Sequence, residues 1–280
     1  MWIFGVIVVA ATISVGWLGS RQERRHPSHH WLTPFFEWFG ELGIFCGRVA
    51  RAVVTPPFEL AELVRQMDAI GSKSLPLVAM AGAATGVVMS LQTHDSLNRF
   101  GAKGMLSTVI VFALIRETGP IITGLVVSGR VAAGIGAELG SMKVTEQIDA
   151  MEVSAVNPYK FLAATRILAC ILMLPLLTLA ADFSGIIMGW VASTLTDSIS
   201  LQLFIQRGFK QVTFHDLLPP TFKTAVFGLI IGTVACFQGM RTRGGTEGVG
   251  RSATSSVVLS SLFLILADVL LVRFILVFFP

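Results

Sequence analysis

The feature that most constrains this chain is a series of long apolar segments separated by shorter polar ones. Several segments reach about 20 residues, the length that an α-helix needs to cross a hydrocarbon core of ~30 Å. Only 14% of the residues are charged, compared with about 25% in an ordinary soluble domain. Backbone polar groups find no partners in lipid, so spanning segments form helices or closed barrels. The short alternating segments of a barrel are missing from the sequence, which therefore predicts an all-α integral membrane protein.

Five core transmembrane helices are predicted, at about residues 75–91, 105–131, 161–193, 221–240 and 255–279. The third is too long for one straight crossing, and Pro175 is a candidate for a kink within it. Lys and Arg are concentrated before the first span, between the second and third, and between the fourth and fifth. Because cytoplasmic loops carry the excess of these residues, the three segments are predicted to be cytoplasmic and the C-terminus outside.

Residues 1–19 form a further apolar run, which is followed by the basic stretch 21–25. A signal peptide carries its positive charge before the apolar core, so this order favours an extra N-terminal span or anchor. A mis-chosen start codon is the alternative, and both interpretations stay open. The predicted division of the chain is an apolar segment with a basic linker at 1–30, amphipathic helices at 31–74 and a membrane domain at 75–280.

Residues 35–54 predict an amphipathic helix in the membrane interface. Their charged side chains, Glu37, Glu41, Arg48 and Arg51, fall within an arc of roughly 80° when placed on a helix. Phe and other apolar side chains occupy the remaining surface, as interfacial helices require. Residues 56–70 predict a second, more polar surface helix.

Motifs for catalysis, nucleotide binding and metal binding are missing from the sequence. It has no Walker A pattern, and the Gly-rich stretch 244–250 lacks the phosphate-binding Lys and is interpreted as a flexible turn. Neither a Ser/His/Asp arrangement nor zinc-ligand spacing occurs, and the three cysteines are far apart in apolar surroundings. The net charge of +4 is attributed to cytoplasmic loops, with no nucleic-acid partner expected. The sequence thus predicts no enzyme, and no cofactor or metal bound by this chain.

Arg116 and Glu117 lie within the second predicted span and are followed by Gly119 and Pro120. Charges inside a membrane helix are costly and face a partner or a cavity. One interpretation is a local ion pair buried against a neighbouring helix, and the other is a polar point on a substrate path. Pro120 loosens the helix there, because proline removes a backbone donor.

Four small residues, Ser128, Ala132, Gly136 and Gly140, recur every four positions and so share one helix face. Such a face permits close helix packing, either within the chain or between two copies of it. Residues 146–158 then combine acids at three-residue spacing, Glu146, Asp149 and Glu152, with the apolar Ile148, Met151 and Val153. This pattern is typical of a short helix that docks into another protein, and a solvated connector is the alternative.

These same segments closely resemble the MlaE/YrbE family of ABC transporter permeases. The resemblance is carried by RETGP at 116–120, SGRVAAGIGAELGSMKVTEQIDAME at 128–152 and AVNP at 155–158. It extends more loosely from about residue 35 to the C-terminus, including DLLPPTFKTAVFG at 216–228 and the loop at 244–252. Residues 75–280 accordingly resemble the permease domain, whereas the first 30 residues depart from the family pattern.

The resemblance implies a homodimeric permease of a lipid transporter in a bacterial inner membrane, with phospholipid moving between the inner and outer membranes. It implies a cytoplasmic ATPase, which hydrolyses the ATP, a periplasmic MCE-domain protein and, in some systems, a STAS-domain protein. It assigns Glu146, Gln147, Asp149, Met151 and Glu152 to a coupling helix at the ATPase. It assigns Arg116 and Glu117 to the lipid path.

Two other functions stay open on the residues alone. An ion-coupled secondary transporter would use Arg116, Glu117, Asp182, Asp268 and Arg273 as a relay, although no internal repeat of the kind common in such folds is evident. A membrane scaffold that only anchors an MCE ring is the other. The sequence determines neither the lipid nor the direction of its transport.

Overall fold

The computed structural model describes residues 33–56, 59–197, 199–210, 212 and 214–278, and these residues form helices and connections without a strand. The chain separates into two compact units, one ending at Thr55 and the other beginning at Pro56. The first unit contains α2 (Thr33–Val54), where the sequence predicted the amphipathic helix. The apolar run at 1–19 lies outside the described residues. The division of the chain into three parts stays a prediction.

The second unit confirms the predicted all-α membrane fold. Five of its helical segments are long and apolar enough to cross a membrane, by length and composition: Leu60–Arg99, Lys103–Val144, Tyr159–Thr196, Asp216–Met240 and Gly245–Ile275. The first is α3 (Leu60–Arg99), and the last two belong to α10 (Phe214–Met240) and α11 (Gly245–Phe278). Two short helices, α7 (Gln147–Val153) and α9 (Leu201–Phe209), lie in the connections.

Three π-helical turns interrupt the second and third spans. The second span consists of η1 (Lys103–Met105), α4 (Leu106–Ala113), the π-turn η2 (Leu114–Thr118), α5 (Gly119–Val127), the π-turn η3 (Ser128–Ala132) and α6 (Ala133–Val144). The third begins with the π-turn η4 (Tyr159–Ala164) and continues as α8 (Thr165–Asp197). Single π-turns inside α-helices are rare and occur frequently at functional sites. Two of these three turns contain predicted site residues.

The predicted bounds differ from the observed ones where polar residues continue a helix. α3 is one helix of 40 residues, whereas the sequence predicted a surface helix at 56–70 and a separate span at 75–91. Pro76 lies inside α3 and does not end it, since proline removes only one backbone hydrogen bond and α3 packs along α8. The second span likewise continues to Val144, beyond its predicted end near residue 131.

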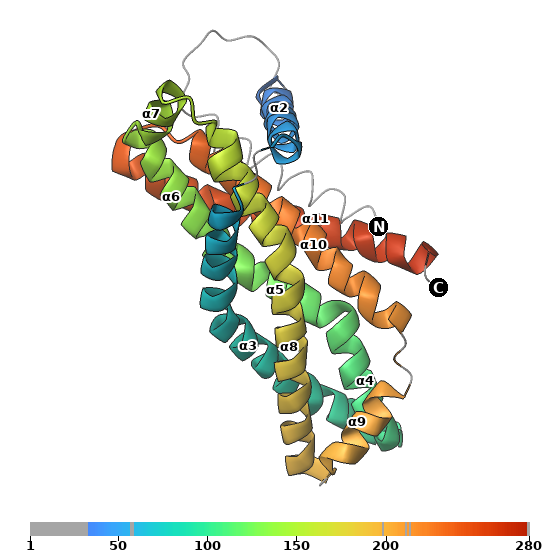
Figure 1. Cartoon of the computed structure of the whole chain (residues 1–280). Helices are drawn as coiled ribbons and strands as arrows, with labels where there is room; N and C mark the ends of the chain where they lie inside the picture. The colour runs from blue at the N-terminus through green and yellow to red at the C-terminus, as the bar shows by residue number, and fades with distance from the viewer. Residues whose placement is uncertain (1–32, 57–58, 198, 211, 213, 279–280) are drawn as a thin grey trace. The chain divides into compact units, whose positions relative to one another are not determined.

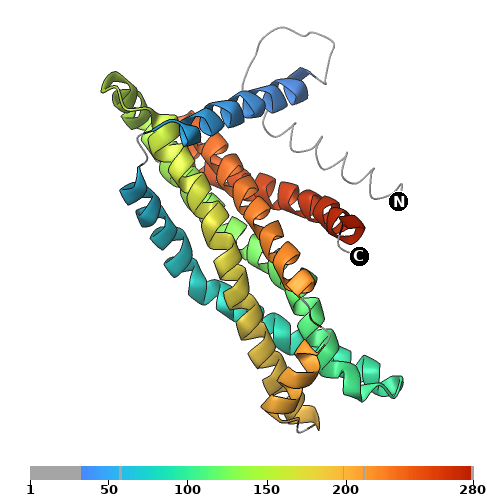
Figure 2. The ribbon, with the colours of Figure 1, turned by 45° about the vertical axis from the view of Figure 1, so that its right-hand side comes forward.

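The spans of the second unit pack through close backbone contacts. α3 lies along α8, α8 also packs against α10, and α6, α10 and α11 contact one another. Figure 2 shows α8 in yellow and α10 in orange running side by side. A Cβ added at Gly86 of α3 would overlap the carbonyl of Gly185 on α8, so only glycine permits this approach. α7 and the end of α6 lie at one end of the unit, whereas α4 and α9 lie at the other (Figure 1).

Candidate functional site

An ion network between three spans surrounds the π-turn η2, which carries both Arg116 and Glu117. These two residues pair with α10 rather than with each other in the described part of the chain. Glu117 Oε2 lies 2.8 Å from Lys223 Nζ, and Arg116 Nη1 lies 3.7 Å from Asp216 Oδ1. The guanidinium of Arg116 also stands 5.2 Å from the ring centre of Phe112, a cation–π distance.

Lys223 is the centre of this network. Its side chain is only 1% exposed, and its Nζ also lies 2.9 Å from Asp268 Oδ1 on α11. The contact to Asp268 is an ion pair, whereas Lys223 donates a hydrogen bond of 2.8 Å to Glu117. One cation therefore lies between two anions, and only Glu117, 43% exposed, is accessible from outside. A buried lysine in such a place requires these partners, because an unpaired charge is costly in an apolar interior.

A second buried acid lies beside the π-turn. Asp182 of α8 is 6% exposed, and its Oδ1 has no hydrogen-bond partner among the described residues. This oxygen occupies the position where a Cβ would stand if Gly119 were any other residue. Gly119 directly follows η2, so α8 and the π-turn meet at the carboxyl group.

Sequence reasoning placed Arg116 and Glu117 at this site but missed its central residue. Lys223 and Asp216 both lie in the stretch 216–228 that resembles the family, but sequence reasoning assigned neither of them a role at the site. Asp182 and Asp268 were considered only as relay residues of an ion-coupled transporter. The sequence did contain one indication of this residue, a lysine just inside a long apolar segment. It was placed at the end of the span only because the helix was predicted to start at residue 221, whereas α10 begins at Phe214, about two helical turns earlier.

The small-residue face packs within the chain. Ser128 Oγ lies 2.8 Å from Ser261 Oγ on α11, and Ser252 Oγ donates a hydrogen bond of 3.3 Å to the carbonyl of Gly136. A Cβ at Gly140 would lie 2.8 Å from Oγ1 of Thr242, which follows α10, and Ala132 is fully buried. Of the two interpretations, the structure thus shows close packing against α11 and the residues that follow α10.

α7 lies where the sequence placed a docking helix. Glu146, Gln147, Asp149 and Glu152 are exposed, Met151 is partly buried and Ile148 is buried against the unit. Glu146 differs from expectation: it precedes α7 in the left-handed conformation, with φ 58°, and so does not share the helix face of the other two acids. Val153 is 90% exposed and makes no core contact, whereas Asp149 accepts a 2.6 Å hydrogen bond from Lys143.

The end of α7 is a Schellman motif. The N–H of Ala155 donates to the carbonyl of Glu152, and the N–H of Val156 donates to that of Met151. Ala155 has φ 61°, a conformation that glycine normally supplies. Left-handed residues therefore bracket α7 on both sides and determine how it leaves and rejoins the spans.

The described residues contain no group of three or more His, Cys, Asp or Glu side chains arranged to hold a metal ion. The interpretation of the Gly-rich stretch 244–250 as a flexible turn is wrong, because α11 begins at Gly245 and includes the rest of the stretch, and only Gly244, with positive φ, precedes the helix. The candidate site therefore consists of charged side chains inside the spans and an exposed helix at one end of them.

Comparison with known proteins identifies the family of the chain. The family model of the permease MlaE matches residues 63–274. A probable ABC transporter permease of Rickettsia typhi is 35% identical over 237 residues, covering 85% of this chain and 92% of the relative. A probable ABC transporter permease of Synechocystis is 31% identical over 241 residues, covering 86% of this chain and 92% of the relative.

A plant protein is also similar. The chloroplastic protein TRIGALACTOSYLDIACYLGLYCEROL 1 of Arabidopsis thaliana is 31% identical over 254 residues, covering 90% of this chain and 73% of the relative. The match to the family model covers α3 through most of α11, which includes the ion network and α7. This multi-pass membrane chain therefore belongs to the MlaE permease family of ABC transporter permeases.

Proposed function

We propose that the chain is the permease subunit of a lipid transporter, with phospholipid as its cargo between the inner and outer bacterial membranes. The observation that carries this proposal is the ion network of Glu117, Lys223 and Asp268 inside the spans. Charged residues inside membrane spans are costly, and they mark substrate or ion pathways. The name of the Arabidopsis relative refers to a galactolipid, which supports a lipid cargo.

The proposed mechanism uses charge and movement without bond chemistry by this chain. A phospholipid head group carries a phosphate and, in many lipids, an amine, which are the ionic partners of Lys223 and Glu117 respectively. Glu117 is the accessible member and meets the head group first, and Arg116 at the edge of the network assists through its guanidinium. Release of Glu117 from Lys223 frees the buried ammonium for the phosphate.

Energy enters at α7 in this proposal. Its exposed acids and apolar residues are suited to docking into a cytoplasmic ATPase, which hydrolyses ATP and displaces the helix. A homodimer, a periplasmic MCE-domain protein, a STAS-domain protein and an inner-membrane location belong to the same proposal and rest on the family resemblance alone.

Reconstitution into proteoliposomes with the cognate ATPase tests the proposal. We expect ATP-dependent transfer of a fluorescent phospholipid, and we expect mass spectrometry to find phospholipid in the purified complex. Glu117→Gln should lower transfer by about tenfold, the effect of losing one charge-assisted contact. Glu146→Lys combined with Glu152→Lys should abolish both ATPase association and transfer.

The matched control is Glu247→Lys, which reverses an exposed acid near the start of α11 and should leave transfer unchanged. If the charge reversals on α7 left ATPase association intact, the docking assignment would be wrong. Transfer that continued without any ATPase, but collapsed with the proton gradient, would instead favour an ion-coupled transporter.

A further inference from the structure

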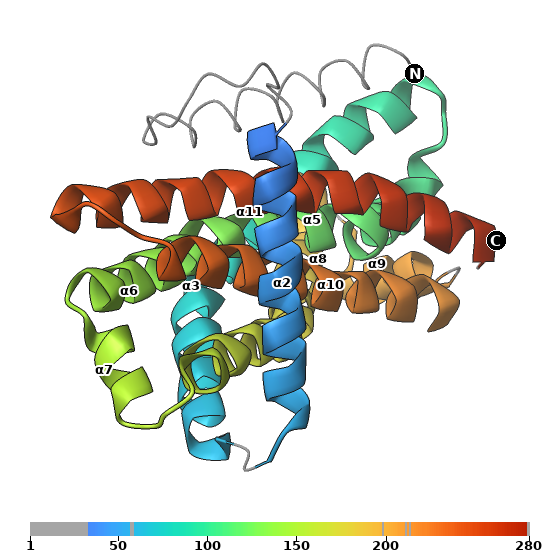
Figure 3. The ribbon, with the colours of Figure 1, turned by 90° about the horizontal axis from the view of Figure 1, so that it is seen from above.

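One ion pair joins the two helices between which the connection with α7 runs. Figure 3 shows this connection leaving the end of α6, passing through α7 and returning to the start of the third span. Arg166 Nη2 on α8 lies 2.8 Å from Glu138 Oε1 on α6. Each residue stands within about two helical turns of the point where its helix meets the connection.

Arg166 is buried and depends on Glu138 for its counter-charge. Its side chain is 1% exposed, whereas that of Glu138 is 51% exposed. A guanidinium does not lose its proton in a protein, so burial does not neutralise it and an anion is required. Glu138 supplies that anion from the neighbouring helix, and Arg166 Nε has no partner among the described residues.

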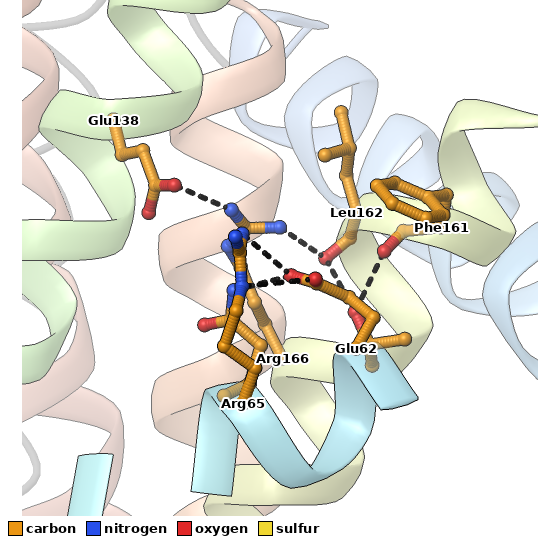
Figure 4. A network of polar contacts seen from close by, with 8 residues as sticks. Glu62, Arg65, Glu138, Phe161, Leu162 and Arg166 are labelled. Carbon is orange, nitrogen blue, oxygen red and sulfur yellow. Dashed lines mark hydrogen bonds and ion pairs between the residues drawn. The ribbon is translucent and has the colours of Figure 1, made fainter. Parts of the chain in front are cut away.

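The same arginine also supports the π-turn η4. Its Nη1 donates a 3.0 Å hydrogen bond to the carbonyl of Leu162, and Thr165 Oγ1 donates one of 2.7 Å to the carbonyl of Phe161 (Figure 4). Where a π-turn passes into an α-helix the backbone register changes, and side-chain donors can take up carbonyls left without a helical partner. Arg166 therefore joins three parts: the first turn after α7, the helix before α7 and the long span α8.

Rigid helices connect this point to the ion network. Along α8, Asp182 reaches the backbone at Gly119, next to the π-turn that holds Glu117. Beside Arg166, a Cβ added at Gly232 of α10 would stand 2.9 Å from the Cα of Ile167, so the two backbones are in direct contact. α10 is also the helix of Lys223, so α8 is in direct contact with the elements on both sides of the network.

We propose that Arg166 and Glu138 form a positioning clamp that passes a displacement of α7 into the spans. We call this pair the α6–α8 clamp. The proposal rests on the proposed function, in which α7 receives the force from an ATPase. The clamp makes α6 and α8 move together with α7, so that ATP hydrolysis is converted into rearrangement of the ion network.

The test uses the full chain with its ATPase in proteoliposomes. We expect Glu138→Ala to keep ATPase association and hydrolysis while lipid transferred per ATP falls by about tenfold, equivalent to one lost charge-assisted contact. Glu138→Gln, which keeps an acceptor for Arg166, should restore part of the transfer. The control Glu247→Gln removes an exposed ion pair with Arg251 near the start of α11 and should change nothing. Unchanged transfer per ATP in Glu138→Ala would overturn the proposal.

A double variant separates coupling from stability. Glu138→Ala leaves Arg166 buried without a counter-charge and should lower the thermal unfolding temperature. Glu138→Met with Arg166→Met removes both charges, so its unfolding temperature should be close to that of the natural chain. Lipid transfer per ATP should nevertheless stay low, because the link between the helices is missing. If transfer recovered together with stability, the pair would have a structural role only and the clamp would be rejected.

A distance measurement tests the clamp without the ATPase. In the full chain with Cys46→Ser, nitroxide labels at Val153→Cys and Leu176→Cys report how α7 is placed on α8, since both positions are exposed and Cys170 and Cys236 are buried. Glu138→Ala should broaden the distance distribution, and an unchanged width would contradict the clamp. If instead the natural chain bound no ATPase and transferred no lipid, the proposed function would fail, and the coupling role with it.

Discussion

At the scale of single residues, Lys223 is a charged side chain that is almost fully buried within the spans. It is the buried cation between Glu117 and Asp268, and its removal leaves Asp268 buried without a counter-charge. Breaking a buried ion pair in this way costs about 3–5 kcal/mol. Because Glu117 is partly exposed and can be hydrated, we expect Lys223→Met to lower the free energy of unfolding by about 3 kcal/mol, the lower end of that range.

This expectation is checked by unfolding in mixed micelles followed by circular dichroism. The double variant Lys223→Met with Asp268→Asn removes the buried acid as well and should recover much of the loss. Equal stability of Lys223→Met and the natural chain would mean that the network contributes nothing to folding. It would then be retained for the cargo alone.

Ala155 is a second residue with a sharp prediction, because it holds a left-handed conformation at the end of α7. That conformation costs a residue with a Cβ about 1–2 kcal/mol, whereas glycine costs about 0.4–1 kcal/mol in unfolded-state entropy. We therefore expect Ala155→Gly to stabilise α7 locally by about 0.5–1 kcal/mol, the difference between these effects. Native-state hydrogen exchange at residues 147–156 measures it.

The control is the same substitution within the helix. Ala150 is exposed in the middle of α7, so Ala150→Gly should weaken the protection of these amides by about 1 kcal/mol. Opposite signs for the two substitutions would confirm that position 155, rather than glycine in general, determines the effect. If Ala155→Gly and Ala150→Gly lowered the protection of these amides equally, the Schellman motif would be contradicted.

At the scale of elements, the α3–α8 interface depends on glycine. Gly86→Ala places a methyl group against the carbonyl of Gly185, and backbone atoms on both sides must move apart. Overpacking of this kind costs about 1–3 kcal/mol. Gly134 of α6 is the matched control: a Cβ there meets nothing within 4 Å, and Gly134→Ala should gain up to about 1 kcal/mol through helix propensity. Thermal unfolding in detergent compares the two, and a neutral Gly86→Ala would show that the helices separate easily.

The elements also show what sequence reasoning can and cannot provide. Apolar segment length predicted five spans, because lipid permits few alternatives. The narrow arc of charged side chains predicted the helix of α2. Helix ends were predicted poorly, since the polar residues before Leu75 continue α3 through packing on α8. Gly82 and Gly86 have the same four-residue spacing as the predicted small-residue face, so this interface carried a signal that was not used.

Sequence reasoning likewise predicted one part of the candidate site and missed another. Arg116 and Glu117 are conspicuous as charges within an apolar run, so the sequence alone identified them. Their partners were not predictable, because they come from α10, more than 90 residues away along the chain. The π-turns have no recognised sequence pattern, and they rotate the residues that follow by changing the helical register.

At the scale of the whole molecule, the arrangement of the second unit predicts which segments face each compartment. α7 and α9 lie at opposite ends of that unit (Figure 1). Its longest helix, α3, has 40 residues and therefore a length of about 60 Å, twice the ~30 Å of a hydrocarbon core. α3 is thus long enough to extend beyond the lipid, and we expect both short helices to be reachable by water-soluble reagents.

Basic residues set the orientation. Lys143, Lys160 and Arg241 are at or near the end of the unit that carries α7, so the positive-inside rule predicts that α7 faces the cytoplasm and α9 the opposite side. In a Cys46→Ser chain, a membrane-impermeant maleimide should label Gln206→Cys in intact spheroplasts. It should label Val153→Cys, whose native side chain is 90% exposed, only in inverted vesicles. Labelling of both positions from one side would require an even number of crossings between α7 and α9. Because Tyr159–Thr196 is the one predicted span between these two helices, it would then have to lie on the membrane surface. If the shared side were the outer one, α7 would also lose its access to an ATPase.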